Sequence, residues 1–443
     1  MINKKLTVIL IGAFLLRLIS LNQSLWLDEA ISVQVARNMT PTTIISRFSP
    51  YDFHPPVFYI LLHYWIRIFG ASEISVRMPS VIFSMVTIYF VYLIGKKISS
   101  EKTGLAAALL TAVNPLFLYY SQETRMYSLA TTLLTISLYY WLKLQEKNAD
   151  KKSVIFYNLF SGLSFLCFYG SIFMTVSLGI VLLLKKKFKM AVVSNIGMVL
   201  AIMIVSPLLL TQLKNSKVTL ADVKNWSAAL GKVTIKNLLL IPLKFSIGRI
   251  SFYPKIIYWI TAGAATTAVF GTALKGFWKN KLLAAVFVLP LFTATLFSAI
   301  SPMLSYFRYL YLIPVLALAI GLAVKEKKQL LFVFFLTAGF SLSYLLNPAF
   351  HREDWKTLAR SISGKPVYMI ESVADPIHYY RPEIVTNDLK NFKSKEAEIL
   401  VIPYASEIHG LDYRNILINN GYELVQINNF RELTSEEWKI RQL

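Results

Sequence analysis

The chain has 443 residues, of which 55% are hydrophobic and only 16% are charged. Soluble domains average about 45–50% apolar and about 25% charged residues, so this composition excludes an ordinary soluble protein and predicts a polytopic membrane protein. The formal net charge is +22, but the basic residues cluster between long apolar runs. That pattern is typical of membrane topology signals and of contacts with lipid headgroups, so we expect no nucleic-acid partner.

Long apolar runs predict the membrane-spanning helices. They occur at residues 6–25, 74–95, 103–120, 126–142, 189–212, 256–274, 282–300, 306–324 and 329–346. Each is long enough, or nearly so, for a hydrocarbon core of about 30 Å at about 1.5 Å per residue. The longer run at 153–184 has lysines at both ends, so we expect it to cross twice as a tight hairpin, which brings the total to about 11 helices.

Charge distribution predicts the orientation. The basic clusters between the runs face the cytoplasm if the N-terminus is inside, and the first run lacks a small-residue cleavage site and is expected to remain as a helix. Residues 54–69 would reverse the later loops if they crossed, so we place them flat in the outer interface, as one of two interfacial helices after the first. We expect His63 and Arg67 to anchor this segment there. The external segment 213–255 holds eight basic residues and one acid, so either the topology differs here or these residues meet an anionic partner.

The long apolar runs end at residue 346, and shorter predicted elements follow. Short strands are predicted at 365–371, 398–403 and 422–428, and helices near 352–363 and 411–420, with Gly364 and Gly421 where helices end. We therefore predict two domains: a transmembrane domain over residues 1–346 and a small α/β extracytoplasmic domain over residues 347–443. One cysteine, Cys167, excludes an internal disulfide.

On this topology the polar side chains gather at the outer surface. The set is Asp28, Glu29, Asp52, His54, Glu123, Arg125 and Arg308. Arginine binds phosphate oxygens bidentately and a nearby carboxylate can act as a general base, so the set suits an amphiphile with an anionic headgroup. Each residue also has a plain structural alternative, such as a helix cap or an ion pair across a turn. Arg17, inside the first run, is expected to extend its charge to the interface.

The order of these motifs resembles a known superfamily. Leu27-Asp28-Glu29-Ala30 follows a membrane helix; Asp52-Phe53-His54-Pro55-Pro56, Ser75-Val76-Arg77-Met78-Pro79 and Tyr120-Ser121-Gln122-Glu123-Thr124-Arg125 come later. This order is similar to that of the GT-C polyprenyl-phosphate-sugar glycosyltransferases, in particular the relatives of protein O-mannosyltransferases and of the lipid A aminoarabinose transferase. The resemblance implies a polyprenyl-phosphate sugar as donor, used at the outer leaflet of the cytoplasmic membrane.

The resemblance also implies roles for individual residues. Asp28 corresponds to the catalytic acid, and Glu29, Asp52 and Glu123 are supporting acids. Arg125 and Arg308 fall in stretches that resemble donor-facing loops. The remaining candidates for donor or phosphate binding are Lys244 and Arg249, in the basic external segment, and His54.

We therefore expect a glycosyltransferase that moves one sugar to a protein, lipid or glycan acceptor with inversion. Two alternatives stay open: a polymerase or ligase for diphosphate-linked glycans, and a transporter or flippase of lipid-linked sugars without transferase chemistry. The sequence requires no cofactor, although the acids and His54 offer ligands to a divalent cation.

Overall fold

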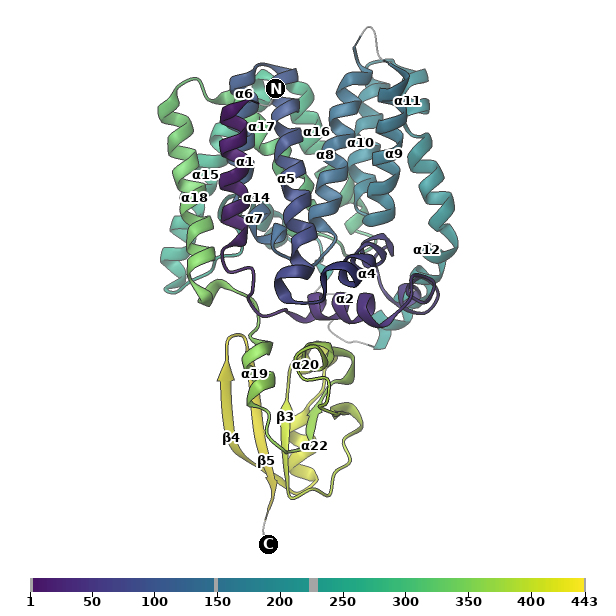
Figure 1. Ribbon diagram of the computed structural model, residues 1–443, viewed down its shortest axis with the longest axis vertical. Helices are drawn as coiled ribbons and strands as arrows, with labels where there is room; N and C mark the ends of the chain where they lie inside the picture. The colour runs from purple at the N-terminus through teal and green to yellow at the C-terminus, as the bar shows by residue number, and fades with distance from the viewer. Residues whose placement is uncertain (1–2, 147–149, 223–229, 442–443) are drawn as a thin grey trace.

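The computed structural model describes residues 3–146, 150–222 and 230–441. It has a tall bundle of helices, and a small sheet domain below one end of the bundle (Figure 1). The bundle contains α1 (Lys4–Leu18), α5 (Glu73–Ile98), α6 (Glu101–Ala112), α7 (Pro115–Ser121), α8 (Tyr127–Leu144), α9 (Lys151–Cys167), α10 (Ser171–Leu184), α11 (Phe188–Ser194), α12 (Ile196–Asp222), α14 (Ile235–Ile247), α15 (Lys255–Lys279), α16 (Lys281–Ser298), η3 (Tyr306–Leu312), α17 (Ile313–Ala323) and α18 (Lys327–Leu346).

Six stretches of the described chain are helices long and apolar enough to cross a membrane. They are α5, α11 with α12, α15, α16, η3 with α17, and α18, and the bent pair of α6 and α7 makes a seventh if it counts as one span. The chain is thus a mostly helical multi-pass membrane protein, as its composition predicts. The total of about 11 crossings remains a prediction.

The predicted helix at 103–120 is not continuous. It breaks into α6 and α7, which meet at an angle of 63°. Pro115 cannot donate a backbone hydrogen bond, and the Asn114 side chain accepts from the backbone N–H groups of Leu116 and Phe117, so a new helix starts at this point. The run at 153–184 likewise breaks between Cys167 and Ser171, where the hairpin turn is expected.

Two helices lie across the lower end of the bundle, at a steep angle to the upright ones: α2 (Leu27–Asn38) and α4 (Val57–Phe69) (Figure 1). Short turns α3 (Pro41–Thr43), η1 (Ile44–Phe48) and η2 (Ser49–Tyr51) connect them. The expectation that His63 anchors α4 in the interface is wrong. Its side chain is buried and Nδ1 lies 2.8 Å from the carbonyl of Ala36, so it ties α4 to α2, whereas Arg67 is exposed.

The prediction for Arg17 is also wrong. Its guanidinium is fully buried and donates to the carbonyls of Ala13 and Ala112. Ala112 ends α6, where unpaired carbonyls concentrate partial negative charge, so the arginine stabilises the broken end of that helix.

The C-terminal domain is built on a five-stranded mixed sheet in the order β2-β1-β3-β5-β4. Its strands are β1 (Val367–Met369), β2 (Thr386–Asp388), β3 (Glu398–Ile402), β4 (Tyr422–Phe430) and β5 (Leu433–Ile440). The short helices are η4 (Pro348–Phe350), α19 (Trp355–Ser361), η5 (Glu371–Val373), α20 (Asp375–Tyr380), η6 (Leu389–Asn391), α21 (Ser406–His409) and α22 (Tyr413–Asn419). Strands β1, β2 and β3 are parallel, and β5 runs antiparallel to both β3 and β4. Strands β2 and β5 and helix α20 were not predicted from the sequence.

Candidate active site

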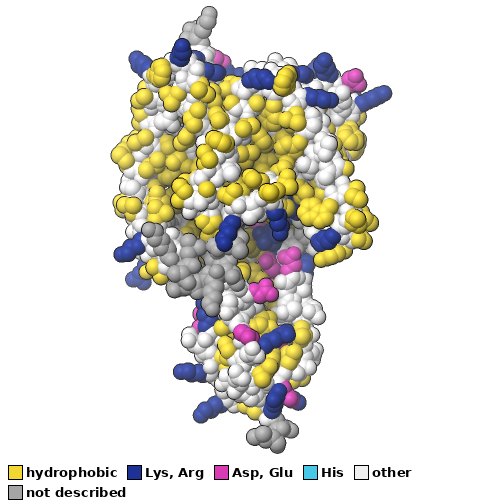
Figure 2. Space-filling view, turned by 180° about the vertical axis from the view of Figure 1, so that it is seen from behind, with side chains coloured by type: hydrophobic (Ala, Val, Ile, Leu, Met, Phe, Trp, Pro, Cys, Tyr) yellow, Lys and Arg dark blue, Asp and Glu magenta, His cyan; other side chains and the backbone are white. Residues whose placement is uncertain are grey.

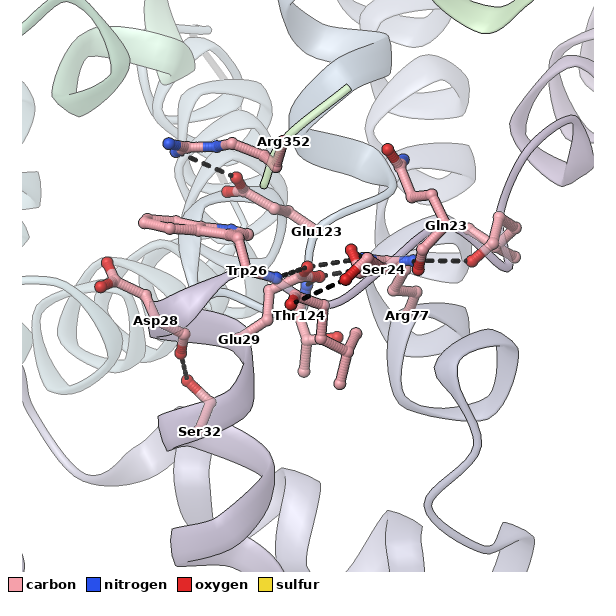
Figure 3. A network of polar contacts seen from close by, with 12 residues as sticks. Gln23, Ser24, Trp26, Asp28, Glu29, Ser32, Arg77, Glu123, Thr124 and Arg352 are labelled. Carbon is pink, nitrogen blue, oxygen red and sulfur yellow. Dashed lines mark hydrogen bonds and ion pairs between the residues drawn. The ribbon is translucent and has the colours of Figure 1, made fainter. Parts of the chain in front are cut away.

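The site is organised by the first turn of α2, which carries two adjacent carboxylates with different environments. Figure 3 shows Asp28 and Glu29 pointing in opposite directions. The Asp28 side chain is 37% exposed, whereas that of Glu29 is 1% exposed. The two acids therefore have separate tasks: Asp28 can meet a ligand, and Glu29 belongs to the interior.

Glu29 is held by a buried ion pair with Arg77 of α5. The two nitrogens Nε and Nη2 of Arg77 donate to Oε1 and Oε2 of Glu29 at 2.9 and 2.6 Å, a bidentate pair. Glu29 Oε1 also accepts from the backbone N–H of Thr124 at 2.7 Å. This carboxylate thus connects α2 to α5 and to the turn between α7 and α8.

Arg77 also holds the loop that leads from α1 to α2. Its remaining donors reach the carbonyls of Leu21, Gln23 and Ser24 at 2.6–3.0 Å. All five guanidinium N–H groups therefore have acceptors, and the residues before Asp28 are fixed relative to α5 (Figure 3). We did not single out Arg77 from the sequence as a site residue, although it stands in the Ser-Val-Arg-Met-Pro motif.

Asp28 faces a cluster built around Arg125. Arg125 Nη2 lies 3.5 Å from Asp28 Oδ2, and Arg125 Nη1 lies 3.3 Å from the hydroxyl oxygen of Ser32 and 3.5 Å from that of Tyr59. The Tyr59 hydroxyl donates to Asp52 at 2.7 Å. Asp28, Arg125 and Asp52, which are far apart in the sequence, thus form one contiguous group.

Asp52 and His54 form the outer part of this group. His54 Nδ1 lies 3.2 Å from Asp52 Oδ1. Burial opposes ionisation of Asp52, but His54, Arg125 and the hydrogen bond from Tyr59 outweigh it and lower the pKa of Asp52. The residues around His54 are themselves fixed by α12, since Gln212 Nε2 donates to the carbonyls of Ser49 and His54.

A second group lies on the Glu123 side of Trp26. Arg352, near the start of the C-terminal domain, lies 3.6 Å above the Trp26 ring, and its Nη2 is 3.6 Å from Glu123 Oε1 (Figure 3). Arg352 Nε and Arg249 Nη1 both donate to the hydroxyl oxygen of Tyr119, at 2.6 and 2.9 Å. Two cations from distant parts of the chain therefore meet at one phenol.

Glu123 has little access to the outside. It lines a small cavity of about 10 Å³, and neither carboxyl oxygen has a hydrogen-bond partner. Burial raises the pKa of Glu123 to about 7, and the nearby Glu29 adds to the shift although Arg352 opposes it. Of the acids in the two groups, the more exposed Asp28 is better placed to act on a ligand.

The other two predicted cations lie beside these groups. Arg308 donates to the carbonyl of Leu230, and the adjacent Phe307 packs against Tyr120 and Tyr127 in the helices that flank Arg125. Arg308 is thus at the same end of the bundle as Asp28. Lys244 joins neither group, because its ammonium donates to the Ile250 carbonyl and the Tyr258 hydroxyl; burial and the nearby Arg249 and Lys255 lower its pKa to about 8.

The candidate metal ligands do not converge. Asp28, Glu29, Asp52, His54 and Glu123 are divided among three settings, as described above. In the part of the chain that the structure describes, no three His, Cys, Asp or Glu side chains form a group that could hold a metal ion. We therefore derive no step through a metal.

Comparison with known proteins supports the resemblance to GT-C glycosyltransferases that the sequence motifs indicate. Residues 53–210 match the model of the dolichyl-phosphate-mannose-protein mannosyltransferase family. None of the curated proteins matches the sequence.

Solved structures share the fold at low sequence identity. Apo ArnT from Cupriavidus metallidurans has a TM-score of 0.62 at 11% identity, with 97% of each chain covered. The same protein bound to undecaprenyl phosphate has a TM-score of 0.50 at 12% identity, covering 98% of this chain and 97% of that one. Archaeal oligosaccharyltransferase AglB from Archaeoglobus fulgidus, in complex with an inhibitory peptide and a dolichol-phosphate, has a TM-score of 0.50 at 13% identity, with 84% of this chain and 63% of AglB covered.

Proposed function

We propose that the protein transfers a single sugar from a polyprenyl-phosphate donor to an acceptor, with inversion, at the outer leaflet of the cytoplasmic membrane. The observation that carries the proposal is the pairing of a half-exposed carboxylate, Asp28, with the guanidinium of Arg125 at the same end of the bundle as Arg249 and Arg308. Solved relatives of the same fold bind undecaprenyl phosphate or dolichol-phosphate. A carboxylate beside several cations suits a reaction that removes a proton and releases a phosphate.

In the proposed reaction an acceptor hydroxyl or amine attacks the anomeric carbon while Asp28 takes its proton. The bond from the anomeric carbon to the phosphate oxygen breaks, and the polyprenyl phosphate leaves with the electron pair. Arg125, Arg308 and Arg249 would stabilise the charge that develops on this phosphate. Such fixed cations are often the largest single catalytic factor, and removing one donor lowers the rate by about 10²–10³-fold.

The remaining predicted residues receive supporting roles in this proposal. His54 already contacts Asp52, so it would orient that acid and act on the donor only through it. Lys244 is close enough to Arg249 for its pKa to respond to that charge, so it would add positive potential near the phosphate. Glu29 would position α2.

The proposed topology has the N-terminus inside and the C-terminal domain and the active site outside. Eleven helical segments support it: α1, α5, α6 with α7, α8, α9, α10, α11 with α12, α15, α16, η3 with α17, and α18. They correspond to the ten predicted apolar runs, with α9 and α10 together in the run at 153–184. The N-terminus lies at the end of the bundle farthest from the sheet domain (Figure 1), and basic side chains line that edge (Figure 2). The division into domains at residues 346 and 347 is part of the same proposal; α18 ends at Leu346.

Asp28→Asn tests the catalytic assignment. We expect the purified variant to lose at least about 10²-fold in transfer from a labelled polyprenyl-phosphate sugar, because a positioned base contributes about 10²–10⁴-fold. Its thermal stability should stay close to that of the wild type because the side chain is half-exposed. Glu29→Gln is the matched control: it alters the neighbouring, buried carboxyl and should lower thermal stability first. Near-normal turnover in Asp28→Asn protein would refute the role of Asp28.

The donor is tested separately. Mass spectrometry of lipid that co-purifies with the Asp28→Asn protein should detect a polyprenyl chain with one phosphate and one sugar. The likeness to AglB supports the alternative of a longer glycan donor. Parallel assays with monophosphate-linked and diphosphate-linked donors distinguish the two, since only the first should give product under our proposal.

A further inference from the structure

A large groove lies where the bundle meets the C-terminal domain, away from Asp28. It has a volume of about 560 Å³ and lies between the C-terminal end of α2, the turn from α4 to α5, and helices α19 and α20. Figure 1 shows α20 directly below α2. Asp28 and Arg37 are nine residues apart in α2, which corresponds to about 14 Å along the axis and about half a turn around it. The groove is therefore on the opposite side of α2 from the candidate catalytic acid.

The charge of the groove is positive. Arg37, Lys356 and Arg360 line it together with one acid, Glu73. Glu73 is already paired with Lys356, at 2.7 Å. Neither Arg37 nor Arg360 has an ion pair or a hydrogen bond from its side chain within the described residues, and both are exposed. Two guanidinium groups, one from α2 and one from α19 of the C-terminal domain, are thus free to bind an anion.

The wall of the groove is fixed before any ligand arrives. The Tyr379 hydroxyl donates to the carbonyl of Ala71 at 2.7 Å, and the Tyr380 hydroxyl accepts from the backbone N–H of Leu25 at 2.8 Å. These bonds hold α20 against both the turn before α5 and the loop before α2. A preformed wall lowers the entropy that binding must overcome.

Exposed apolar side chains stand at the end of α4, next in the chain to residues that line the groove. Ile66, Gly70 and Ala71 line the groove, and their neighbours in the chain, Ile68 and Phe69, are 73% and 57% exposed. Exposed apolar side chains beside unpaired cations are the arrangement that binds an amphiphile with an anionic head.

We propose that this groove binds the phosphate headgroup of an anionic membrane lipid, with the acyl chains along Ile68 and Phe69. The phosphate would lie between Arg37 and Arg360 and so link the C-terminal domain to α2. This is a second lipid site, separate from the one that the proposed donor would occupy, and it holds whether or not Asp28 catalyses transfer.

The experiment is a lipid titration of the full-length protein in detergent, followed by native mass spectrometry. Phosphatidylglycerol is the anionic probe, phosphatidylcholine of the same chains is the zwitterionic probe, and inorganic phosphate tests the headgroup alone. We expect the Arg37→Gln/Arg360→Gln variant to bind phosphatidylglycerol about tenfold more weakly than the wild type, because guanidinium–phosphate contacts are charge-assisted. Lys393→Gln/Lys395→Gln removes two exposed cations elsewhere in the C-terminal domain. This control variant should bind phosphatidylglycerol as the wild type does.

The other outcomes would overturn the proposal. Equal affinity for the two lipids in the wild type would show that the phosphate charge is not recognised. An equal loss of affinity for phosphatidylglycerol in both double variants would show that the net charge of the protein, and not this groove, determines lipid binding. Occupancy by inorganic phosphate that competes fully with phosphatidylglycerol would identify a free-anion site in place of a lipid site. Because donor turnover is not measured, a failure here is distinct from a failure of the proposed function.

Discussion

Replacing Arg77 by Met should be among the most damaging single changes in the chain. Arg77 is 1% exposed, and its guanidinium makes five hydrogen bonds, two to Glu29 and three to the carbonyls before α2. Removing one partner of a buried ion pair costs about 3–5 kcal/mol, because the other charge stays buried without compensation. The three carbonyls also lose their donors, so we expect a loss near the upper end of this range, about 4–5 kcal/mol.

A double-mutant cycle with Glu29→Met separates the ion pair from the contacts to the loop. In the double variant no isolated charge remains, so its cost should be about 2–3 kcal/mol less than the sum of the two single changes. The carbonyls of Leu21, Gln23 and Ser24 and the N–H of Thr124 remain unpaired, so the double variant should still be less stable than the wild type. Arg77→Lys keeps the charge but loses the bidentate geometry and should be intermediate.

The assay is equilibrium unfolding in mixed micelles, with the midpoint and slope compared across the four proteins of the cycle. A cost below about 1 kcal/mol for Arg77→Met would contradict the view that this residue fixes the loop before Asp28. Strict additivity in the cycle would contradict the coupling between the two charges.

Two further predictions concern Glu123 and a close helix contact. The pKa of Glu123 is about 7 in the folded protein and about 4.5 in the unfolded chain, so between these pH values the folded state holds the extra proton. The free energy of unfolding should therefore fall by about 3 kcal/mol as the pH rises from 4.5 to 7 and change no further above that. Glu123→Gln protein should lack this pH dependence. Gly276→Ala should destabilise the packing of α15 on α17, because the added Cβ would lie 1.8 Å from the Ala319 carbonyl oxygen. Gly263→Ala, on the same helix, adds a Cβ that meets nothing within 4 Å, so it should be neutral or slightly stabilising in the same unfolding assay.

Features that follow from local composition were predicted well. The long apolar runs correspond to helices because a bilayer requires such length and hydropathy, and the break near Tyr169 and Gly170 follows from a run too long for one crossing and too short for two full helices. Most of the segment 54–69 is indeed one helix, α4 (Val57–Phe69), across the bundle end, but the sequence could not show that α2 covers one side of it. His63 was misplaced for that reason.

Strand β5 is a second feature that the local sequence does not predict. Its residues, Leu-Thr-Ser-Glu-Glu-Trp-Lys-Ile, are too polar to predict a strand inside a sheet, yet the strand lies between β3 and β4. Glu436 is buried there because Arg414 donates to it at 2.6 Å and Tyr413 at 3.0 Å. A buried acid is stable only with such partners, and their positions are set by tertiary packing that the local pattern does not contain.

Arg352 is a residue of the site that was not predicted from the sequence. In the sequence it precedes Glu353 and Asp354 at the start of the C-terminal domain, where an arginine beside two acids predicts only a solvated ion pair. In the fold it stacks on Trp26, pairs with Glu123 and shares the Tyr119 hydroxyl with Arg249. The C-terminal domain begins with a side chain that belongs to the membrane domain's polar cluster. Its position therefore couples the charge around Glu123 to the docking of the sheet domain, which Tyr379 and Tyr380 fix independently at Ala71 and Leu25. Since Leu25 and Trp26 immediately precede the turn that carries Asp28, the sheet domain holds the same loop that Arg77 clamps from the membrane side, and the orientation of the proposed base depends on both.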